Sequence, residues 1–272
     1  MPLAVCATPI GNLEDVTLRV LAELREADVV LCEDTRHTST LLDRYGIAAA
    51  ARLLSYHEHN EAARTEELLP RLAAGERMAL VSDAGLPGVN DPGGRLVSAA
   101  LERGVAVTVL PGPSAVETAL VASGLAGDQY RFLGYLPRRE AERKTLWEEL
   151  RHWPHPAVGF ESPKRLPGSL RSLAAVFPDR RVAVCRELTK RFEEVVRGTA
   201  AALAASFADP PKGEITLVID GSPPGAMHVA SFDAAVTTVQ ELVAEGVPRR
   251  RAAELAAALS GQSRNALYRA SL

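Results

Sequence analysis

The feature that most constrains this chain is an alternation of short apolar runs with segments in which apolar residues recur at helical spacing. The apolar runs at residues 3–7, 29–32 and 78–81 have the length of buried strands. Residues 13–24 carry apolar side chains on one helical face, with Asn12 in the N-cap position. Strands that alternate with helices in this way predict an α/β domain with a mostly parallel sheet.

The alternation restarts after about residue 123 and predicts a second α/β domain. The expected strands of this domain are residues 132–136, 157–160, 182–185, 194–197 and 215–219. Of these, 194–197 is expected to lie at the edge of the sheet. Segment 221–225 has the composition of a linker, and helical patterns follow at residues 234–244, 250–259 and 264–270. We therefore predict an N-terminal α/β domain (1–122), a C-terminal α/β domain (123–223) and a helical tail (224–272).

Composition excludes several classes of protein. The chain has 272 residues, of which 47% are hydrophobic and 24% charged, as in ordinary globular proteins. No apolar run approaches the roughly 18 residues of a membrane span, and no signal peptide is visible at the start of the chain. Three widely separated cysteines, Cys6, Cys32 and Cys185, exclude a disulfide framework and a clustered zinc site. We expect a cytoplasmic protein.

Charge is distributed unevenly along the chain. Residues 1–115 contain 10 basic and 16 acidic residues, whereas residues 130–197 contain 15 basic and 9 acidic ones. A basic central stretch beside an acidic first domain is compatible with binding of a polyanion. It is equally compatible with a solvated charged surface.

Four turns stand where predicted strands end, at residues 8–12, 33–37, 82–94 and 110–115. In open α/β sheets, ligands bind beyond the carboxyl ends of the strands. The turns contain glycines together with the acceptors Glu33, Asp83 and Asp91, but no phosphate-binding G-x-x-x-x-G-K-[ST] or G-x-G-x-x-G motif. This chemistry favours a ligand that carries hydroxyl and amine groups over one that carries phosphates.

The same turns resemble the signatures of the ribosomal small-subunit methyltransferase I family, within the tetrapyrrole-methylase superfamily. The matching segments in the first predicted domain are ATPIGNLED (7–15), EDTRHT (33–38), YHEHN (56–60), SDAGLPGVNDPG (82–93) and LPGPSA (110–115). Those in the second are GYLP (134–137), ESPKR (161–165), RELTK (186–190) and KGE (212–214). Leu86 and Asn90 depart from the family pattern, where Thr and Ser are usual.

The resemblance implies two α/β domains with a cofactor cleft between them, plus a small C-terminal helical appendage. It implies S-adenosylmethionine as methyl donor and, as substrate, the ribose 2′-hydroxyl of a decoding-centre cytidine in 16S rRNA of the small ribosomal subunit. It also implies a homodimer, with no membrane and no metal. The residues it places at the cofactor are Pro9, Gly11, Asp83, Ala84, Gly85, Ser114, Ala115, Glu161, Glu187 and Gly213.

A ribose hydroxyl is a poor nucleophile, so the reaction needs a group that accepts its proton. Glu33 and Asp34, at a predicted strand end, are the first choice for a catalytic or positioning role. An equally weighted alternative is that Asp34 only caps the following helix. Arg36 is suited to hold a phosphate next to the target. The remaining candidate bases are His57, Glu58, His59 and Lys190.

Three further features carry alternatives. His57 and His59 would share one face of a strand, but no cysteine completes a zinc site, so we predict no metal. Trp147 and Trp153 are interpreted as packing residues in preference to a platform for RNA bases. The tail resembles a helix-turn-helix appendage, and its role is either an RNA clamp or helix packing.

Two rival classes of function remain. One is a carbon-methylating enzyme of corrin biosynthesis, or a diphthamide-pathway methyltransferase, with the same cofactor cleft. The other is a ligand-sensing nucleic-acid-binding regulator. That regulator would need a strongly basic recognition helix, whereas the final predicted helix offers only Arg264 and Arg269.

Overall fold

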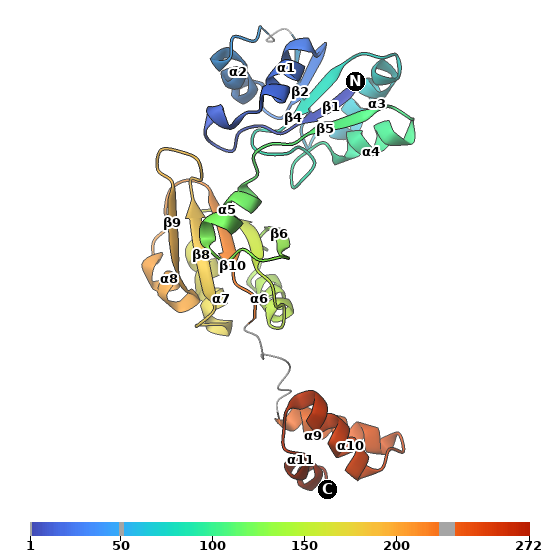
Figure 1. The fold of residues 1–272 in the computed structure, drawn as a ribbon, viewed down its shortest axis with the longest axis vertical. Coiled ribbons are helices and arrows are strands. Elements are labelled where there is room, and N and C mark those ends of the chain that lie inside the picture. The colour runs from blue at the N-terminus through green and yellow to red at the C-terminus, as the bar shows by residue number, and fades with distance from the viewer. Residues whose placement is uncertain (1, 49–51, 223–231) are drawn as a thin grey trace.

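The computed structural model describes residues 2–48, 52–222 and 232–272. The first unit is built on a five-stranded sheet with the order β3-β2-β4-β1-β5, in which all pairings are parallel. Its strands are β1 (Leu3–Cys6), β2 (Val29–Cys32), β3 (Leu53–Ser55), β4 (Met78–Val81) and β5 (Val107–Leu110). The predicted parallel sheet is therefore confirmed, and it lies in the upper half of Figure 1.

Helices cover both faces of this sheet because its central strands are apolar on both sides. They are α1 (Leu18–Glu26), α2 (Thr35–Arg44), α3 (Glu61–Ala73) and α4 (Gly94–Glu102). Ala4 and Cys6 of β1 pack with α1 and α2, whereas Leu3 and Val5 pack with α3 and α4. A strand buried on both faces reads as a continuous apolar run, which is why the sequence identified β1.

The continuous helix predicted over residues 13–24 is wrong. The chain forms a short 3₁₀ helix at Leu13–Asp15, and α1 begins only at Leu18. Asn12 caps the 3₁₀ helix by accepting from Glu14 N at 3.1 Å, while Thr17 caps α1 by accepting from Val20 N at 3.2 Å. Two separate caps each satisfy free N–H groups, so the chain bends between them.

The second unit contains a mixed five-stranded sheet with the order β6-β7-β10-β8-β9. Its strands are β6 (Arg131–Tyr135), β7 (Ala157–Glu161), β8 (Arg181–Arg186), β9 (Glu194–Thr199) and β10 (Ile215–Ile219). β6 and β7 are parallel, whereas β10 is antiparallel to both β7 and β8, and β9 is antiparallel to β8. β9 lies at the edge, as predicted.

Helices also cover the second sheet on both faces. One face carries α6 (Glu140–Leu150), α7 (Leu166–Val176) and α8 (Ala200–Ser206). Trp147 of α6 is completely buried in this layer and donates its Nε1–H to Ser172 Oγ at 3.0 Å. Its role is packing, as the sequence favoured, since a buried indole offers no platform for RNA bases.

Helix α5 (Ala115–Ser123) covers the other face of the second sheet. Its residues Val116, Ala119 and Leu120 pack against Val158 of β7 and Ala183 of β8. The sequence assigned this helix to the first domain. The predicted boundary near residue 123 stays a prediction, and the contacts of α5 favour a change of unit before Ala115.

The three tail helices predicted from the sequence are α9 (Phe232–Ala244), α10 (Arg249–Ser260) and α11 (Arg264–Ala270). They pack on one another around Val239, Ala253 and Leu267, which are each completely buried. Gly261 adopts φ +68° and ends α10. Of the predicted linker at 221–225, residues 223–225 lie outside the described residues. Among the described residues, no helix combines the length and apolarity that a bilayer crossing requires.

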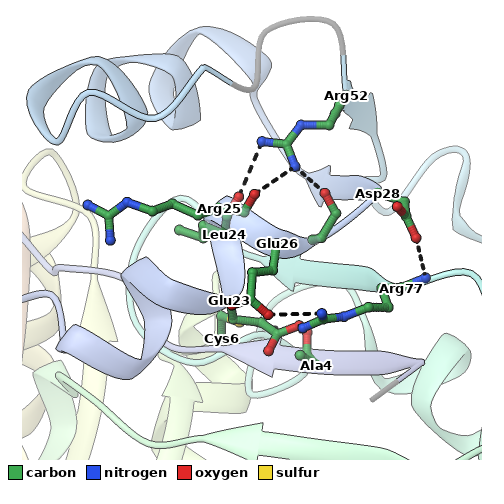
Figure 2. Close-up of polar contacts among 10 residues, drawn as sticks. Ala4, Cys6, Glu23, Leu24, Arg25, Glu26, Asp28, Arg52 and Arg77 are labelled. Atoms are coloured by element: carbon green, nitrogen blue, oxygen red, sulfur yellow. Dashed lines mark hydrogen bonds and ion pairs between the residues drawn. The ribbon is translucent and has the colours of Figure 1, made fainter.

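Two arginines tie α1 to the strand ends beside it (Figure 2). Arg52 donates to the carbonyl oxygens of Arg25 at 3.3 Å and Leu24 at 3.5 Å, and also to that of Ala27. These carbonyls belong to the end of α1 and have no partner within the helix. Arg77 forms ion pairs with Glu23 and Glu26 on the same helix, at 3.2 and 2.9 Å.

We predict that Arg52→Ala lowers the local stability of α1 by about 1 kcal/mol, because several carbonyl groups at the end of the helix, two of them partly buried, lose their donor. Native-state hydrogen exchange of the α1 amides measures this quantity. The matched control is Arg19→Ala, which removes an exposed arginine from the same helix. Equal protection of α1 in both variants would contradict the prediction.

Candidate active site

A cavity of about 670 Å³ lies between the turns of the first sheet and one edge of the second. Ile10, Gly85 and Ser114 line it from the first-unit turns, and Phe132 and Phe160 line it from the second sheet. Its volume falls within the roughly 300–1,000 Å³ typical of small-molecule sites. The structure therefore offers one large, partly apolar site where the sequence predicted a cleft.

The turn after β1 and the turn after β4 are joined by a pair of backbone hydrogen bonds. Thr8 N donates to Gly85 O at 2.8 Å, and Gly85 N donates to Thr8 O at 3.1 Å. Gly85 adopts φ +82°, a conformation that side-chain-bearing residues rarely take. This bridge fixes the start of the segment 82–91, whose residues Ala84, Gly85 and Asp91 line the cavity.

The first turn of α5 also lines the cavity. Ser114 is its N-cap residue, yet its side chain accepts no hydrogen bond from the helix. Instead Ser114 Oγ donates to the Glu117 carboxylate, which also accepts from the Tyr130 hydroxyl. Burial opposes ionisation of Glu117, but these two hydrogen bonds hold its pKa below the usual range. The cavity thus has both backbone N–H groups and an ionised carboxylate on one wall.

Asp91 also lines the large cavity, and its carboxyl group has a raised pKa. Burial, together with the nearby charges of Glu33 and Asp83, raises the pKa of Asp91 to about 6, although a hydrogen bond with Ser82 acts in the opposite direction. Asp91 lines the large cavity, while the two acids that influence it line a neighbouring one.

This smaller cavity, of about 470 Å³, lies at the carboxyl ends of β2, β3 and β4. Its lining contains all three predicted catalytic residues, Glu33, Asp34 and Arg36, together with further polar side chains: Thr35, Ser55, His57, His59 and Asp83. The segment 82–91 contributes to both cavities, with Asp83 in the smaller and Ala84 in the larger. Two chemically different sites therefore share one wall.

Asp34 is fully engaged by its neighbours. Its carboxylate caps α2 by accepting from Arg36 N at 2.9 Å, and it accepts from the Arg36 guanidinium at 3.1 and 2.6 Å. These hydrogen bonds hold the pKa of Asp34 well below its usual range. Asp34 therefore caps α2 and also holds the Arg36 side chain, and a carboxylate with so low a pKa is a poor proton acceptor.

Glu33 differs from Asp34 in its surroundings. Partial burial is the main cause that raises the pKa of Glu33, and the charge of Asp83 adds to it, whereas His57 acts in the opposite direction. A carboxylate with a raised pKa is a stronger base and lies closer to the range useful for proton transfer near neutral pH. Of the two adjacent carboxylates, Glu33 therefore binds a proton more readily than Asp34.

His57 is held by its contacts with Asn60. The Asn60 amide accepts from His57 N at 2.9 Å and donates to Ser55 O at 3.2 Å, which fixes its orientation. Its NH₂ group consequently faces His57 Nε2 at 3.2 Å, whereas His57 Nδ1 is buried without a hydrogen-bond partner among the described residues.

His57 and His59 do not share a strand as predicted. They lie in the turn between β3 and α3, with ring centroids 5.9 Å apart and planes at 70°. Short local hydrogen bonds of Asn60 favour this turn over extension of β3. No group of three or more possible His, Cys, Asp or Glu metal ligands occurs in residues 2–48, 52–222 and 232–272.

Several predicted cofactor residues lie outside the large cavity. Gly11 contacts the loop after β8: a Cβ there would lie 2.5 Å from Lys190 Cγ and 2.7 Å from Thr189 Oγ1. Pro9 is buried beside it, and Asp83 lines the smaller cavity. Gly11 therefore acts in the contact between the two units, which Asn12 N completes by donating to Thr189 Oγ1 at 3.0 Å.

The predicted residues of the second sheet are close to the cavity but heavily bonded. Glu161 lines it, yet its carboxylate accepts from Ser162 N at 2.6 Å and Ser169 Oγ and pairs with Arg165 at 2.5 Å. Glu187 accepts from Glu214 N at 2.9 Å, a contact for which Gly213 leaves room. Gly213 lines the cavity, as do Ser114 and Ala115.

The sequence reasoning missed Glu117, Tyr130 and Tyr135 as lining residues. Glu117 is the third residue of α5, where an acid at a helix start is the available signal. Tyr135 lies in the GYLP segment (134–137) that resembles the family signature, whereas no comparable signal marks Tyr130.

Comparison with known proteins matches these features. Residues 2–204 match the family model of the tetrapyrrole (corrin/porphyrin) methylases, and residues 230–272 match that of the RsmI C-terminal HTH domain. A uroporphyrin-III C-methyltransferase from Thermus thermophilus, solved in complex with S-adenosylhomocysteine, superposes with a TM-score of 0.54 at 20% identity. It covers 80% of this chain and 96% of its own. A diphthine synthase gives a TM-score of 0.59 at 16% identity, covering 80% and 89%.

The fold and the site thus define a methyltransferase of the tetrapyrrole methylase class. The ribosomal RNA small subunit methyltransferase I of Mesorhizobium japonicum is 46% identical over 98% of this chain and 90% of its own. That of Micromonospora olivasterospora is 44% identical over 98% and 85%. The chain belongs to the ribosomal RNA small subunit methyltransferase I family.

Asp91→Asn tests the electrostatics of the shared wall. Folded Asp91 keeps its proton up to about pH 6, whereas the unfolded chain loses it near pH 4, so the charged form destabilises the fold at higher pH. We predict that Asp91→Asn gains stability relative to the parent chain as pH rises from about 4 to 7. Urea denaturation across this range measures the difference. Exposed Asp128→Asn is the control, and parallel pH profiles for the parent and Asp91→Asn would contradict the assignment.

Proposed function

We propose that this methyltransferase transfers a methyl group from S-adenosylmethionine to the ribose 2′-hydroxyl of a decoding-centre cytidine in 16S rRNA. The observation that carries the proposal is the pair of cavities that share the wall 82–91. The larger cavity suits the donor. The smaller holds Glu33, a carboxylate with a raised pKa, in a position to receive a proton.

The residues of the large cavity fit S-adenosylmethionine. Ile10 and Phe132 provide apolar surface for an adenine ring, and the start of α5 at Ser114 and Ala115 offers N–H groups to a carboxylate. Ionised Glu117 offers an acceptor to an ammonium group. When bound, the donor supplies an electrophilic methyl group on a sulfonium.

The proposed binding residues fall into two groups by position. Ala84, Gly85, Ser114, Ala115, Glu161 and Gly213 line the cavity and would contact the donor. Pro9, Gly11, Asp83 and Glu187 lie around it and would position these loops. The bonding of Glu161 to Arg165 and Ser169 supports a role in holding the turn after β7 in place.

Proton removal is proposed to occur in the smaller cavity. In this step the carboxylate of Glu33 would accept the proton of the 2′-hydroxyl, and the bound donor would supply its methyl group to the oxygen and leave as S-adenosylhomocysteine. Asp34 orients Arg36, whose side chain is 89% exposed and is available to a phosphate of the substrate. Asp83 accepts from Asp34 N at 3.2 Å and so links this loop to the shared wall.

The proposal also includes the macromolecular partner, the cellular compartment and the oligomeric state of the enzyme. The macromolecular partner is 16S rRNA in the small ribosomal subunit, the compartment is the cytoplasm, and the enzyme acts as a homodimer. Exposed apolar side chains at Val109 of edge strand β5 and Val121 of α5 are surfaces available to a second copy. Corrin-pathway and diphthine enzymes share the fold at 16–22% identity. This likeness supports a common architecture, but it does not extend their substrates to this chain.

The function is tested by methyl transfer to 30S subunits from a strain that lacks the gene. The expected result is incorporation into a single cytidine, identified as a 2′-O-methyl nucleoside by mass spectrometry. Methylation of the base, or no incorporation into 16S rRNA, would reject the proposal.

Ala115→Trp tests the donor site. The indole would fill the cavity beside the start of α5, and we expect S-adenosylhomocysteine to bind at least about 100-fold more weakly, a loss of roughly 2.7 kcal/mol. Isothermal titration calorimetry measures this affinity. Ala141→Trp, at an exposed position of α6, is the matched control. Undiminished affinity in Ala115→Trp would place the donor elsewhere.

Glu33→Gln tests the base. The amide preserves shape but accepts no proton, so we expect the single-turnover rate to fall roughly 10²–10⁴-fold while S-adenosylhomocysteine affinity is unchanged. Glu102→Gln, an exposed change on α4, is the control. A Glu33→Gln enzyme that turns over at the parent rate would remove Glu33 from the mechanism.

A further inference from the structure

The strand directions of the second sheet bring four of its connections to one edge. β7 and β8 run in the same direction, because β10 is antiparallel to both, and β6 is parallel to β7. The carboxyl ends of β6, β7 and β8 and the amino end of β10 therefore meet at the same edge. This edge faces the large cavity, since Tyr135, Pro163, Leu188 and Gly213 line it.

Each of these four connections contains at least one exposed cation. Four of these cations, Arg138 after β6, Lys164 after β7, Arg191 after β8 and Lys212 before β10, are hereafter the cationic rim. Exposed Arg139 after β6 is not included, because it pairs with Glu142 at 3.5 Å. None of the four forms an ion pair with any described residue. Lys164 directly follows Pro163 and Lys212 directly precedes Gly213, so the cationic rim borders the mouth of the cavity.

The acids of the same edge neutralise these cations only in part. Glu161 pairs with Arg165, Glu194 with Arg186, and both Glu187 and Glu214 with Lys190, whereas Glu193 accepts from Thr189 N and exposed Asp209 forms no ion pair with a described residue. Three partner cations and the four cations of the rim therefore face six acids, and the charge left at this edge is positive. A row of free cations in separate loops matches an extended polyanion better than a single small ligand.

Two exposed aromatic rings lie at the same edge. Tyr135 at the end of β6 is 61% exposed and Phe192 in the loop after β8 is 66% exposed, with the Arg191 guanidinium 5.6 Å from the Phe192 ring centre. In Figure 1 the loop that joins β8 to β9 projects toward the first unit. Exposed rings among cations are the features that bind unstacked nucleotides.

We infer that the cationic rim binds the sugar-phosphate backbone of a single-stranded rRNA segment and guides it across the cavity mouth, with an unstacked base against Phe192. The inference rests on the proposed function, because it identifies how that substrate is held. Phosphates along the rim would leave the nucleotide beyond them free to reach the smaller cavity. There Arg36 offers the next exposed cation.

The test measures binding of a naked 16S rRNA transcript at several salt concentrations. Each lost phosphate contact to a single strand reduces the slope of log affinity against log salt by about 0.7. For the combined Arg138→Ala, Lys164→Ala, Arg191→Ala and Lys212→Ala variant we expect the slope to fall by about 3. Affinity at about 0.1 M salt should fall roughly 10²–10³-fold.

The matched control removes four exposed arginines from helices on other surfaces: Arg19→Ala, Arg25→Ala, Arg103→Ala and Arg171→Ala. Its net charge changes equally, so a general electrostatic effect would lower both slopes alike and overturn the inference. Unchanged S-adenosylhomocysteine affinity in the rim variant shows that its fold is intact. An unchanged salt slope in that intact variant also overturns the inference.

Phe192→Ala separates stacking from charge. We expect affinity for the transcript to fall roughly 5- to 150-fold with the salt slope unchanged, and full affinity would remove Phe192 from the surface. Methyl transfer to 30S subunits by the parent enzyme is measured separately. If the parent methylates and the rim variant keeps its slope, only the inference fails; if the parent does not methylate, the proposed function fails irrespective of the rim.

Discussion

The hydrogen-bonded bridge between Thr8 and Gly85 is the contact on which both cavities depend. It joins the turns after two neighbouring parallel strands, and Thr8 Oγ1 adds a bond to Ser82 O at 3.0 Å. The segment 82–91 that it anchors then forms one wall of each cavity. A positive φ at Gly85 makes this close approach possible, so backbone geometry here sets the spacing between donor and acceptor sites.

On this scaffold the acids of the first unit acquire different properties from different neighbours. Asp34 is paired with Arg36 and stays ionised, whereas Glu33 and Asp91 are partly buried beside other carboxylates and hold protons more strongly. The proposed mechanism uses this separation of their pKa values: Asp34 would orient Arg36, and Glu33 would accept a proton. The second unit contributes paired acids and unpaired cations, which suits contact with a polyanion.

The two units also depend on each other physically. Because Gly11 has no side chain, Lys190 and Thr189 contact the turn after β1 at this position. Helix α5 is a second connection, since it leads directly from β5 onto the second sheet. Because α5 packs under the second sheet while its first turn lines the large cavity, movement of one unit against the other would change the shape of that cavity.

The sequence by itself determined β1, β2 and β4 of the first sheet, the turns that follow them, the tail helices and the family. These are recorded locally, in apolar runs, glycines and caps. Only the tertiary structure decided the split of the helix at residues 13–24, the mixed order of the second sheet and the packing of α5. It also decided which acid is free, because Asp34 and Glu33 are adjacent in the chain and differ only in their neighbours. Burial and pairing depend on contacts between distant residues, and no local pattern encodes them.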